Sequence, residues 1–325
     1  MRRREFIGLL GSAAAWPLAA RAQHSGKPPT IGYLGSNTRS PHALTGFHAG
    51  LKERGYVEGH NVRFEYRWAA GYYDRLGALA ADLVQQQVSV LVASGGIQAA
   101  LAAKAATATI PIVFGHGSDP VRFGLVASLN RPGGNITGIT YLTTALESKR
   151  LGLLHELVPG ATDIAVLINP TNPNAENQSK ELKEVGSTLG LKLHFANASS
   201  EREFDMAFAT IVQTPAGALL VASDPFYFNR REQLIALAAR HSIPAMYDFR
   251  AYAEAGGLAS YGTHLTDAYR QVGIYAARIL HGEKPADLPV MQSTRFEFMI
   301  NLQTAKALGL EIPPKLLARA DEVIE

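Results

Sequence analysis

The residue types best suited to chemistry in this chain lie in short polar loops, each of which follows an apolar run. The loops read Gly35-Ser36-Asn37-Thr38, Ser94-Gly95-Gly96, Gly115-His116-Gly117-Ser118-Asp119-Pro120, Asn169-Pro170-Thr171-Asn172-Pro173-Asn174, Ser223-Asp224-Pro225-Phe226-Tyr227 and Tyr247-Asp248-Phe249. Such side chains hydrogen-bond small polar molecules, and bare amides at a helix start bind anionic groups. Ser and Asn also cap helices, and Pro fills a first turn. The recurrence of these loops favours a ligand-binding cleft.

Two carboxylates, Asp119 and Asp224, each stand between a serine and a proline. A carboxylate at this place can hold a ligand ammonium group, although Ser-Asp-Pro is also an ordinary strand-to-helix turn. We expect Asp224 to bind a cationic or hydrogen-bond-donating group of a solute. Ser94 and the amides of Gly95 and Gly96 would then bind its anionic end. A zwitterion such as an amino acid satisfies both ends.

Aromatic residues close to the same loops offer a surface for a flat or apolar ligand, while some of them belong to the core. They are Phe226, Tyr227, Phe228, Tyr247, Phe249 and Tyr261. The expected ligand contacts are Ser36, Asn37, Ser94, Gly95, Gly96, His116, Asp119, Asn169, Asn172, Asn174, Asp224, Phe226, Tyr247 and Tyr261.

The motifs that mark common enzymes do not occur. Ser94-Gly95-Gly96 is not a nucleophile elbow, and the chain has neither a dinucleotide fingerprint nor a phosphate-binding loop. The histidines are not spaced as zinc ligands, so we expect no metal and no cofactor. His116, in a glycine-containing loop, is the best single candidate for an acid or base. An exported hydrolase or isomerase that uses Asp119 or His116 remains the alternative function.

Composition limits the class of protein. The chain has 325 residues, of which 47% are hydrophobic and 18% charged, and this length suggests two domains. The formal charge of +3 lies in residues 1–22, and without them basic and acidic residues are equal in number. We therefore expect no nucleic-acid partner. The absence of cysteine excludes disulfides, thiolate metal sites and cysteine nucleophiles.

The N-terminus is typical of an export signal. Basic residues precede an apolar stretch, Phe6 to Ala20, of about 15 residues, which is shorter than the ~20 needed to span a bilayer. The arginine pair before a hydrophobic pair resembles the twin-arginine signal, with general secretion as the alternative route. An amphipathic helix of the folded domain is a further alternative. We expect residues 1–22 to be cleaved near Ala22 and the protein to be periplasmic.

Beyond this segment, apolar runs alternate with helical stretches, which indicates parallel sheets covered on both faces. Segments near Leu91, Ile110 and Leu51 recur in the same order at offsets of about 130 residues, which favours two copies of one unit. The expected fold is α/β, with two doubly wound parallel-sheet lobes and a three-segment hinge. The expected lobes are 29–142 plus 263–292 and 143–262 plus 293–325. Strands Ile136–Leu142 and Leu258–Gly262 are expected to cross between them, with crossings near Leu142, Gly262 and Pro289.

Several longer motifs carry a resemblance to a known family. They are Leu91-Val92-Ala93-Ser94-Gly95-Gly96, Gly117-Ser118-Asp119-Pro120-Val121, Ser128-Leu129-x-Arg131-Pro132-Gly133-Gly134-Asn135-Ile136-Thr137-Gly138, Asn169-Pro170-x-Asn172-Pro173, Ser223-Asp224-Pro225, Ala255-Gly256-Gly257-Leu258-x-Ser260-Tyr261-Gly262 and Asn301-Leu302-x-Thr304-Ala305-Lys306-x-Leu308-Gly309-Leu310. With them the chain resembles the ABC-transporter substrate-binding proteins related to tryptophan- and tyrosine-binding lipoproteins. The resemblance implies a type-I periplasmic binding protein fold.

The resemblance also implies a function and a partner. Two lobes would close on a small solute, an amino acid or an aromatic or organic acid, and present it to an ABC permease in the inner membrane. The mature chain has no cysteine for a lipid anchor, so we expect a free monomer. A periplasmic sensor subunit that hands its ligand to a receptor would have the same sequence features.

Overall fold

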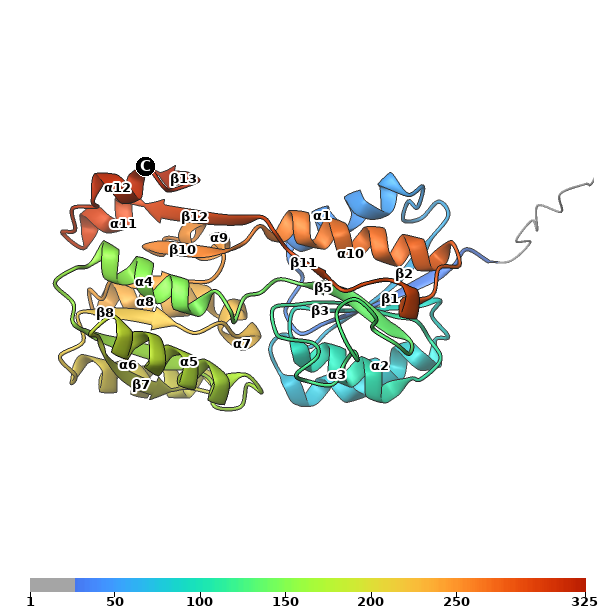
Figure 1. The fold of residues 1–325 in the computed structure, drawn as a ribbon, viewed down its shortest axis with the longest axis horizontal. Helices are drawn as coiled ribbons and strands as arrows, with labels where there is room; N and C mark the ends of the chain where they lie inside the picture. The colour runs from blue at the N-terminus through green and yellow to red at the C-terminus, as the bar shows by residue number, and fades with distance from the viewer. Residues whose placement is uncertain (1–26) are drawn as a thin grey trace, which may run out of the picture.

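The computed structural model describes residues 27–325, and the predicted export signal lies outside them. Two sheets lie side by side along the long axis of the molecule, each covered by helices on both faces (Figure 1). We call the unit around the first sheet the first lobe and the unit around the other the second lobe. Both sheets are built mainly from parallel strands joined through helices, as the alternation of apolar runs and helical stretches predicts. The predicted fold class is thereby confirmed.

The first sheet has the strand order β11-β5-β4-β3-β1-β2, and all its pairs are parallel. Its strands are β1 (Thr30–Gly35), β2 (Arg63–Trp68), β3 (Val90–Ser94), β4 (Ile112–His116), β5 (Ile136–Thr140) and β11 (Met291–Gln292). The helices of this lobe are α1 (Pro41–Glu53), α2 (Leu76–Gln85), α3 (Ile97–Ala106) and α10 (Leu265–Leu280), with short turns η1 (Tyr73–Arg75) and η2 (Pro285–Asp287).

The second sheet has the order β13-β12-β10-β9-β8-β6-β7. Its strands are β6 (Asp163–Ile168), β7 (Lys192–Asn197), β8 (Ala218–Val221), β9 (Ala245–Tyr247), β10 (Ala259–Thr263), β12 (Phe296–Asn301) and β13 (Glu322–Ile324). The helices of this lobe are α4 (Glu147–Leu157), α5 (Ala175–Thr188), α6 (Glu201–Val212), α7 (Pro225–Asn229), α8 (Arg231–Arg240), α9 (Arg250–Glu254), α11 (Leu302–Ala307) and α12 (Pro314–Leu317). No helix within residues 27–325 is long and apolar enough to cross a membrane.

Three segments cross between the lobes: one after β5, one between β10 and α10, and one between β11 and β12 (Figure 1). The two strands expected to cross, Ile136–Leu142 and Leu258–Gly262, instead end inside the sheets as β5 and β10. The crossings are the loops beyond them, because strand residues complete their hydrogen bonds within one sheet. The third crossing follows β11 and so lies beyond Pro289. β10 leaves the second sheet and β12 returns to it, so these two strands pair antiparallel.

Helix α10, near the end of the chain, packs directly on α1 near its beginning. Glycines permit the close approach. A Cβ atom on Gly50 would lie 2.0 Å from the carbonyl oxygen of Arg270, and one on Gly273 would lie 2.1 Å from that of Phe47. Real Cβ atoms do not approach backbone oxygens so closely. With α1 and α10 packed as they are, these two positions therefore accommodate only glycine. The contact attaches the C-terminal part of the chain to the first lobe.

Substituting Gly50→Ala is expected to lower the free energy of unfolding by about 1–3 kcal/mol, because the new methyl group must push the helices apart. The matched control is Gly152→Ala, where a Cβ atom meets nothing within 4 Å. That change is expected to be neutral or stabilising by up to about 1 kcal/mol, since Ala favours the helix interior. Urea unfolding of both variants checks this. Equal stability of the two would contradict the close packing of α1 and α10.

Candidate functional site

A cavity lies between the lobes, at the carboxyl ends of the parallel strands. From the first lobe it is lined by Asn37, by Gly95 to Gln98 at the start of α3, by Gly117 and Ser118, and by Tyr269. From the second lobe it is lined by Asn172, Asn174, Ser223, Asp224, Phe228 and Asp248. Six predicted contacts therefore meet in one place: Asn37, Gly95, Gly96, Asn172, Asn174 and Asp224.

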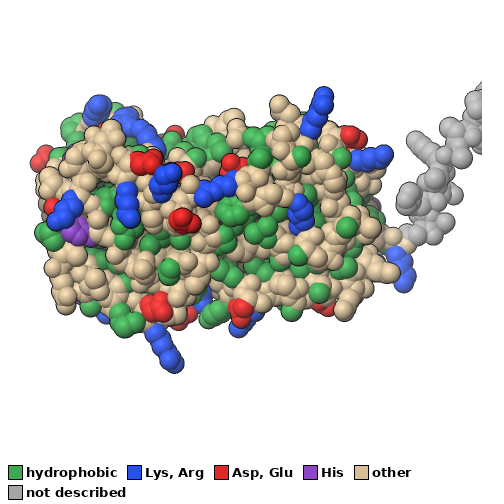
Figure 2. All heavy atoms as spheres, turned by 60° about the horizontal axis from the view of Figure 1, so that its bottom comes forward, with side chains coloured by type: hydrophobic (Ala, Val, Ile, Leu, Met, Phe, Trp, Pro, Cys, Tyr) green, Lys and Arg blue, Asp and Glu red, His purple; other side chains and the backbone are tan. Residues whose placement is uncertain are grey.

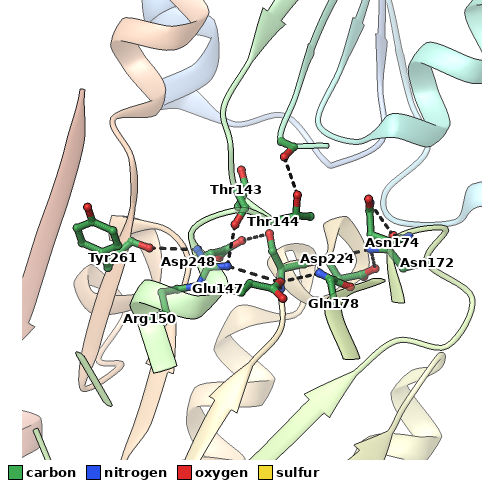
Figure 3. Close-up of polar contacts among 12 residues, drawn as sticks. Thr143, Thr144, Glu147, Arg150, Asn172, Asn174, Gln178, Asp224, Asp248 and Tyr261 are labelled. Carbon is green, nitrogen blue, oxygen red and sulfur yellow. Dashed lines mark hydrogen bonds and ion pairs between the residues drawn. The ribbon is translucent and has the colours of Figure 1, made fainter. Parts of the chain in front are cut away.

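Asp224 is buried, and its carboxylate has five hydrogen-bond donors. The amides of Phe226 and Tyr227 donate to Oδ1 at 2.7 and 3.2 Å, so Asp224 caps helix α7. Oδ2 accepts from Asn169 and Asn172 at 3.2 and 2.7 Å. It also accepts from the Tyr73 hydroxyl, across the cleft, at 2.6 Å. Asp224 and Asn172 are drawn in Figure 3. The carboxylate that we expected to hold a solute is thus already occupied with organising its own loops.

Ser94, expected to hold the anionic end of a solute, lies below the cavity. Its Oγ is hydrogen-bonded to the hydroxyls of Tyr33 and Tyr269 at 2.9 and 2.7 Å. Ser36 is also fully buried, and its Oγ has no hydrogen-bond partner within the described residues. At the cavity itself stands the start of helix α3, where Gly96 occupies the N-cap position and no side chain caps the first amides. Those amides and the helix dipole favour an anionic group.

The two residues of the alternative enzyme hypothesis lie away from this cavity. His116 is fully buried at the end of β4, where its Nδ1 accepts from the Ser118 amide at 3.2 Å and its ring stacks on Phe114. Burial lowers the pKa of His116 to about 3, so the ring is neutral at ordinary pH. Asp119 is exposed and accepts hydrogen bonds from the amides of Val121 and Arg122. Neither residue is itself part of the cavity lining, although His116 contacts the lining residue Ser118.

Three predicted aromatic contacts belong to the cores and not to the cavity. Phe226 and Tyr247 pack in the core of the second lobe, and Tyr261 packs against its other core cluster. The aromatic rings that do line the cavity are Phe228 and Phe249 from the second lobe, with Tyr141 and Tyr269. Phe228 and Phe249 come from the aromatic loops singled out in the sequence, two residues beyond Phe226 and Tyr247. The side that each ring faces depends on helix and loop geometry, which the sequence pattern does not specify.

Other lining residues have no counterpart among the predicted contacts. Thr143 and Thr144 follow β5 on the first crossing, and Gln98 lies in the first turn of α3. In the described part of the chain, Thr143 Oγ1 and Gln98 Nε2 are buried without a hydrogen-bond partner. Both residues lie within four positions of the end of a strand, and this position is the sequence feature that could have predicted them. Both atoms are free to bond a solute.

Asp248 contributes the other carboxylate of the cavity. It is 3% exposed, and Ser223 Oγ donates to its Oδ2 at 2.6 Å. Burial raises the pKa of Asp248 to about 6 despite the nearby Arg150 guanidinium and the Ser223 hydrogen bond. Asp248 thus has fewer hydrogen-bond donors than Asp224 and faces the cavity, which makes it the better-placed carboxylate for a cation.

Contacts between the lobes surround the cavity. Asn174 Nδ2 donates to Ser118 Oγ at 2.8 Å, and the Thr38 amide donates to Asn229 Oδ1 at 2.7 Å. Arg230, at the end of α7, donates to the Ala70 carbonyl at 2.7 Å and to the Tyr72 hydroxyl at 2.9 Å, and it lies over the Tyr72 ring. We call Arg230, Ala70 and Tyr72 the interlobe clamp. Because these bonds require both lobes, the cleft is closed.

Comparison with known proteins identifies the family. The sequence profile described as "ABC transporter substrate binding protein" matches residues 39–324. The chain belongs to this family. Its members are substrate-binding proteins of ABC transporters and not enzymes, so the hydrolase or isomerase alternative is wrong.

Characterised relatives bind aromatic amino acids. The chain is 28% identical to a tyrosine-binding protein of Clostridioides difficile over 276 residues, which is 83% of this chain and 77% of the relative. It also resembles a Streptococcus pneumoniae domain crystallised with L-Trp, at 25% identity and a TM-score of 0.82, covering 91% of this chain and all of that one.

The relatives also bear on the state of the cleft. A ligand-free, open structure of a substrate-binding protein from Clostridium difficile, at 26% identity, gives a lower TM-score of 0.65 over 91% of this chain and 99% of that one. At nearly equal sequence identity, the present structure is therefore closer to the L-Trp complex than to the open form. This agrees with the contacts that join its two lobes.

Substituting Arg230→Ala is expected to enlarge the radius of gyration in small-angle scattering and to weaken solute affinity about 3- to 30-fold, since two interlobe hydrogen bonds are lost. Arg231→Ala is the matched control, because the hydrogen bonds of Arg231 to described residues go to Phe228 and Glu232, both in its own lobe. Equal behaviour of the two variants would show that the interlobe clamp does not hold the closed state.

Proposed function

We propose that this substrate-binding protein captures an aromatic L-amino acid between its lobes. One observation carries the proposal: the cavity between the lobes has the uncapped start of α3 in one lobe and the buried Asp248 carboxylate in the other. The helix start suits the α-carboxylate of an amino acid, and Asp248 suits its ammonium group. Phe228 and Phe249 supply apolar contact for the side chain.

The binding site in this proposal differs from the set expected from sequence. Asn37, Asn172 and Asn174 remain as polar contacts, and Asp248 takes the role first given to Asp224. The amides of Gly96, Ile97 and Gln98 take the role first given to Ser94. The relatives that bind tyrosine and L-Trp support an aromatic amino acid over an organic acid.

The proposal extends to the setting in which the protein works. Lobes 29–142 plus 263–292 and 143–262 plus 293–325 would separate about the three crossings and close on the solute, because a solute that contacts both lobes binds the closed state better. The family implies an ABC permease as partner. We further propose a monomeric, periplasmic protein exported by the twin-arginine route.

L-Tyrosine or L-tryptophan is expected to bind in calorimetry, and mass spectrometry is expected to recover the solute unchanged. Asp248→Asn should weaken binding about 10- to 100-fold, because a charge-assisted hydrogen bond of about 1.5–3 kcal/mol is lost. Asp119→Asn is the control, since this exposed carboxylate lies outside the cavity. If Asp248→Asn binds as tightly as the parent protein, Asp248 does not hold the ammonium group.

Replacing Arg3 and Arg4 by lysine is expected to stop export, because the twin-arginine route requires both arginines. Cell fractionation measures this, and N-terminal sequencing of the exported parent protein should begin at Gln23. Normal periplasmic accumulation of the variant would exclude the twin-arginine route in favour of general secretion.

A further inference from the structure

A buried cluster of charges lies beside the cavity. Glu147 and Arg150 from the start of α4 meet Asp248 from the loop after β9, and all three are at most 3% exposed (Figure 3). Asp224 lies next to them, but its charge is met by five hydrogen-bond donors. Excluding Asp224, the cluster contains two carboxyl groups and one guanidinium group.

Ser223 links the two carboxyl groups to each other. Its amide donates to Glu147 Oε1 at 3.0 Å, and its hydroxyl donates to Asp248 Oδ2 at 2.6 Å. Gln178 Nε2 donates to the same Glu147 oxygen at 2.6 Å. Within residues 27–325, Glu147 Oε2 is buried without a hydrogen-bond partner. The cluster therefore lacks donors for a second full negative charge.

Arg150 is only partly available to neutralise these carboxylates. Its Nη2 lies 3.5 Å from Glu147 Oε1 but donates to the Thr143 carbonyl at 2.9 Å, and its Nη1 donates to the Tyr261 carbonyl at 3.3 Å. Those carbonyls adjoin two of the crossings, so the guanidinium holds the crossing segments as well.

Among the described residues that act on the cluster, none besides Arg150 is a buried cation. The titratable and charged side chains that act on Glu147, Arg150 or Asp248 from neighbouring elements are Asp224 at the start of α7, Tyr252 of α9 and Tyr261 of β10. Beyond Tyr252 lies Arg231 of α8, which is partly exposed and lies beside Glu232. With both carboxyl groups ionised, the cluster has one uncompensated negative charge, and burying such a charge is costly.

We propose that solute capture is coupled to proton release from the Glu147–Asp248 pair. At slightly acidic pH, one of the two carboxyl groups in the empty closed site holds a proton. When the ammonium group of the solute binds Asp248, that proton leaves to solvent, and the ammonium group supplies the missing positive charge. This inference rests on the proposed function, because it requires a cationic group in the solute.

The direction of the pH dependence follows from burial. Desolvation raises the pKa of Glu147 to about 7 and that of Asp248 to about 6, each well above its usual range. As the pH falls from 7.5 to 5.0, protons increasingly occupy the pair and compete with the ammonium group. A competing group with a pKa of about 6 weakens apparent affinity about tenfold over this range. Capture is therefore strongest above neutral pH.

Calorimetry of L-tyrosine and L-tryptophan binding at pH 6.5, in phosphate and in imidazole buffer, counts the protons released, because the two buffers differ in ionisation enthalpy. We expect release of a substantial fraction of one proton per solute, and affinity about tenfold weaker at pH 5.0 than at pH 7.5. Glu147→Gln should reduce both effects, because one negative charge is removed. Glu156→Gln, a change at a partly exposed residue of the same helix that pairs with Arg319, should leave both unchanged. If circular dichroism shows that Glu147→Gln does not fold, the number of protons that the parent protein releases per bound solute tests the proposal by itself.

The outcomes separate this inference from the proposed function. Binding without proton release and with a flat pH profile would overturn the coupling and leave amino-acid capture intact. If neither amino acid binds, the proposed function fails. Carbon-detected NMR titration of the carboxyl groups in the empty protein then tests the charge cluster. A carboxyl group titrating near neutral pH, and lost in Glu147→Gln, supports it; titration of every carboxyl group below pH 5 overturns it.

Discussion

Buried carboxylates at the carboxyl edge of the second sheet constrain the rest of the site. Parallel strands β8 and β9 end side by side, so Asp224 and Asp248 lie at one edge of the sheet. A buried carboxylate is stable only if donors or cations surround it. Asp224 obtains its donors from the start of α7, two asparagines and the opposite lobe. Within residues 27–325, the one side-chain donor to Asp248 is Ser223, and Asp248 shares Arg150 with Glu147. This difference in the number of donors is the reason for proposing that Asp248, and not Asp224, binds the solute.

Closure of the cleft follows from the same constraint. The Tyr73 hydroxyl reaches Asp224, and Asn174 reaches Ser118, only when the lobes are together. A solute bonded to both lobes adds to these contacts. The interlobe clamp of Arg230, Ala70 and Tyr72 adds others at the edge of the cleft. The hydrogen bonds between the lobes therefore link solute binding to closure of the cleft. A permease that recognises the closed form would distinguish loaded from empty protein.

The fold was predictable from sequence because it depends on patterns that tertiary contacts seldom override. Apolar runs, helical stretches and the repeat near Leu91 and Leu220 gave two parallel sheets, and the family motifs gave the same fold. The site was predictable only as a set of loops. Ser94 and His116 occur in the expected loops, yet each is the last residue of a strand and its side chain is buried. Which residue of a loop faces the cleft depends on the conformation of the loop between the strand and the following helix, and the sequence pattern does not specify that conformation.

The roles of the buried charged residues were the hardest to predict from sequence. Glu147 and Arg150 stand three residues apart and look like an ordinary ion pair on a helix surface. Only the tertiary structure shows that α4 buries them between the crossings and the cavity. Asp224, conversely, has the chemistry of a ligand contact, but its five donors make it a structural centre. Composition and spacing do not report how many donors surround a carboxylate.

The most direct test of the central claim compares three solutes in one calorimetric experiment. L-Tyrosine contains both charged groups, tyramine lacks the carboxylate, and 3-(4-hydroxyphenyl)propionate lacks the ammonium group. If the start of α3 and Asp248 bind opposite ends of the solute, each truncated analogue should bind at least about tenfold more weakly than L-tyrosine. Equal affinity for L-tyrosine and either analogue would contradict capture of a zwitterion.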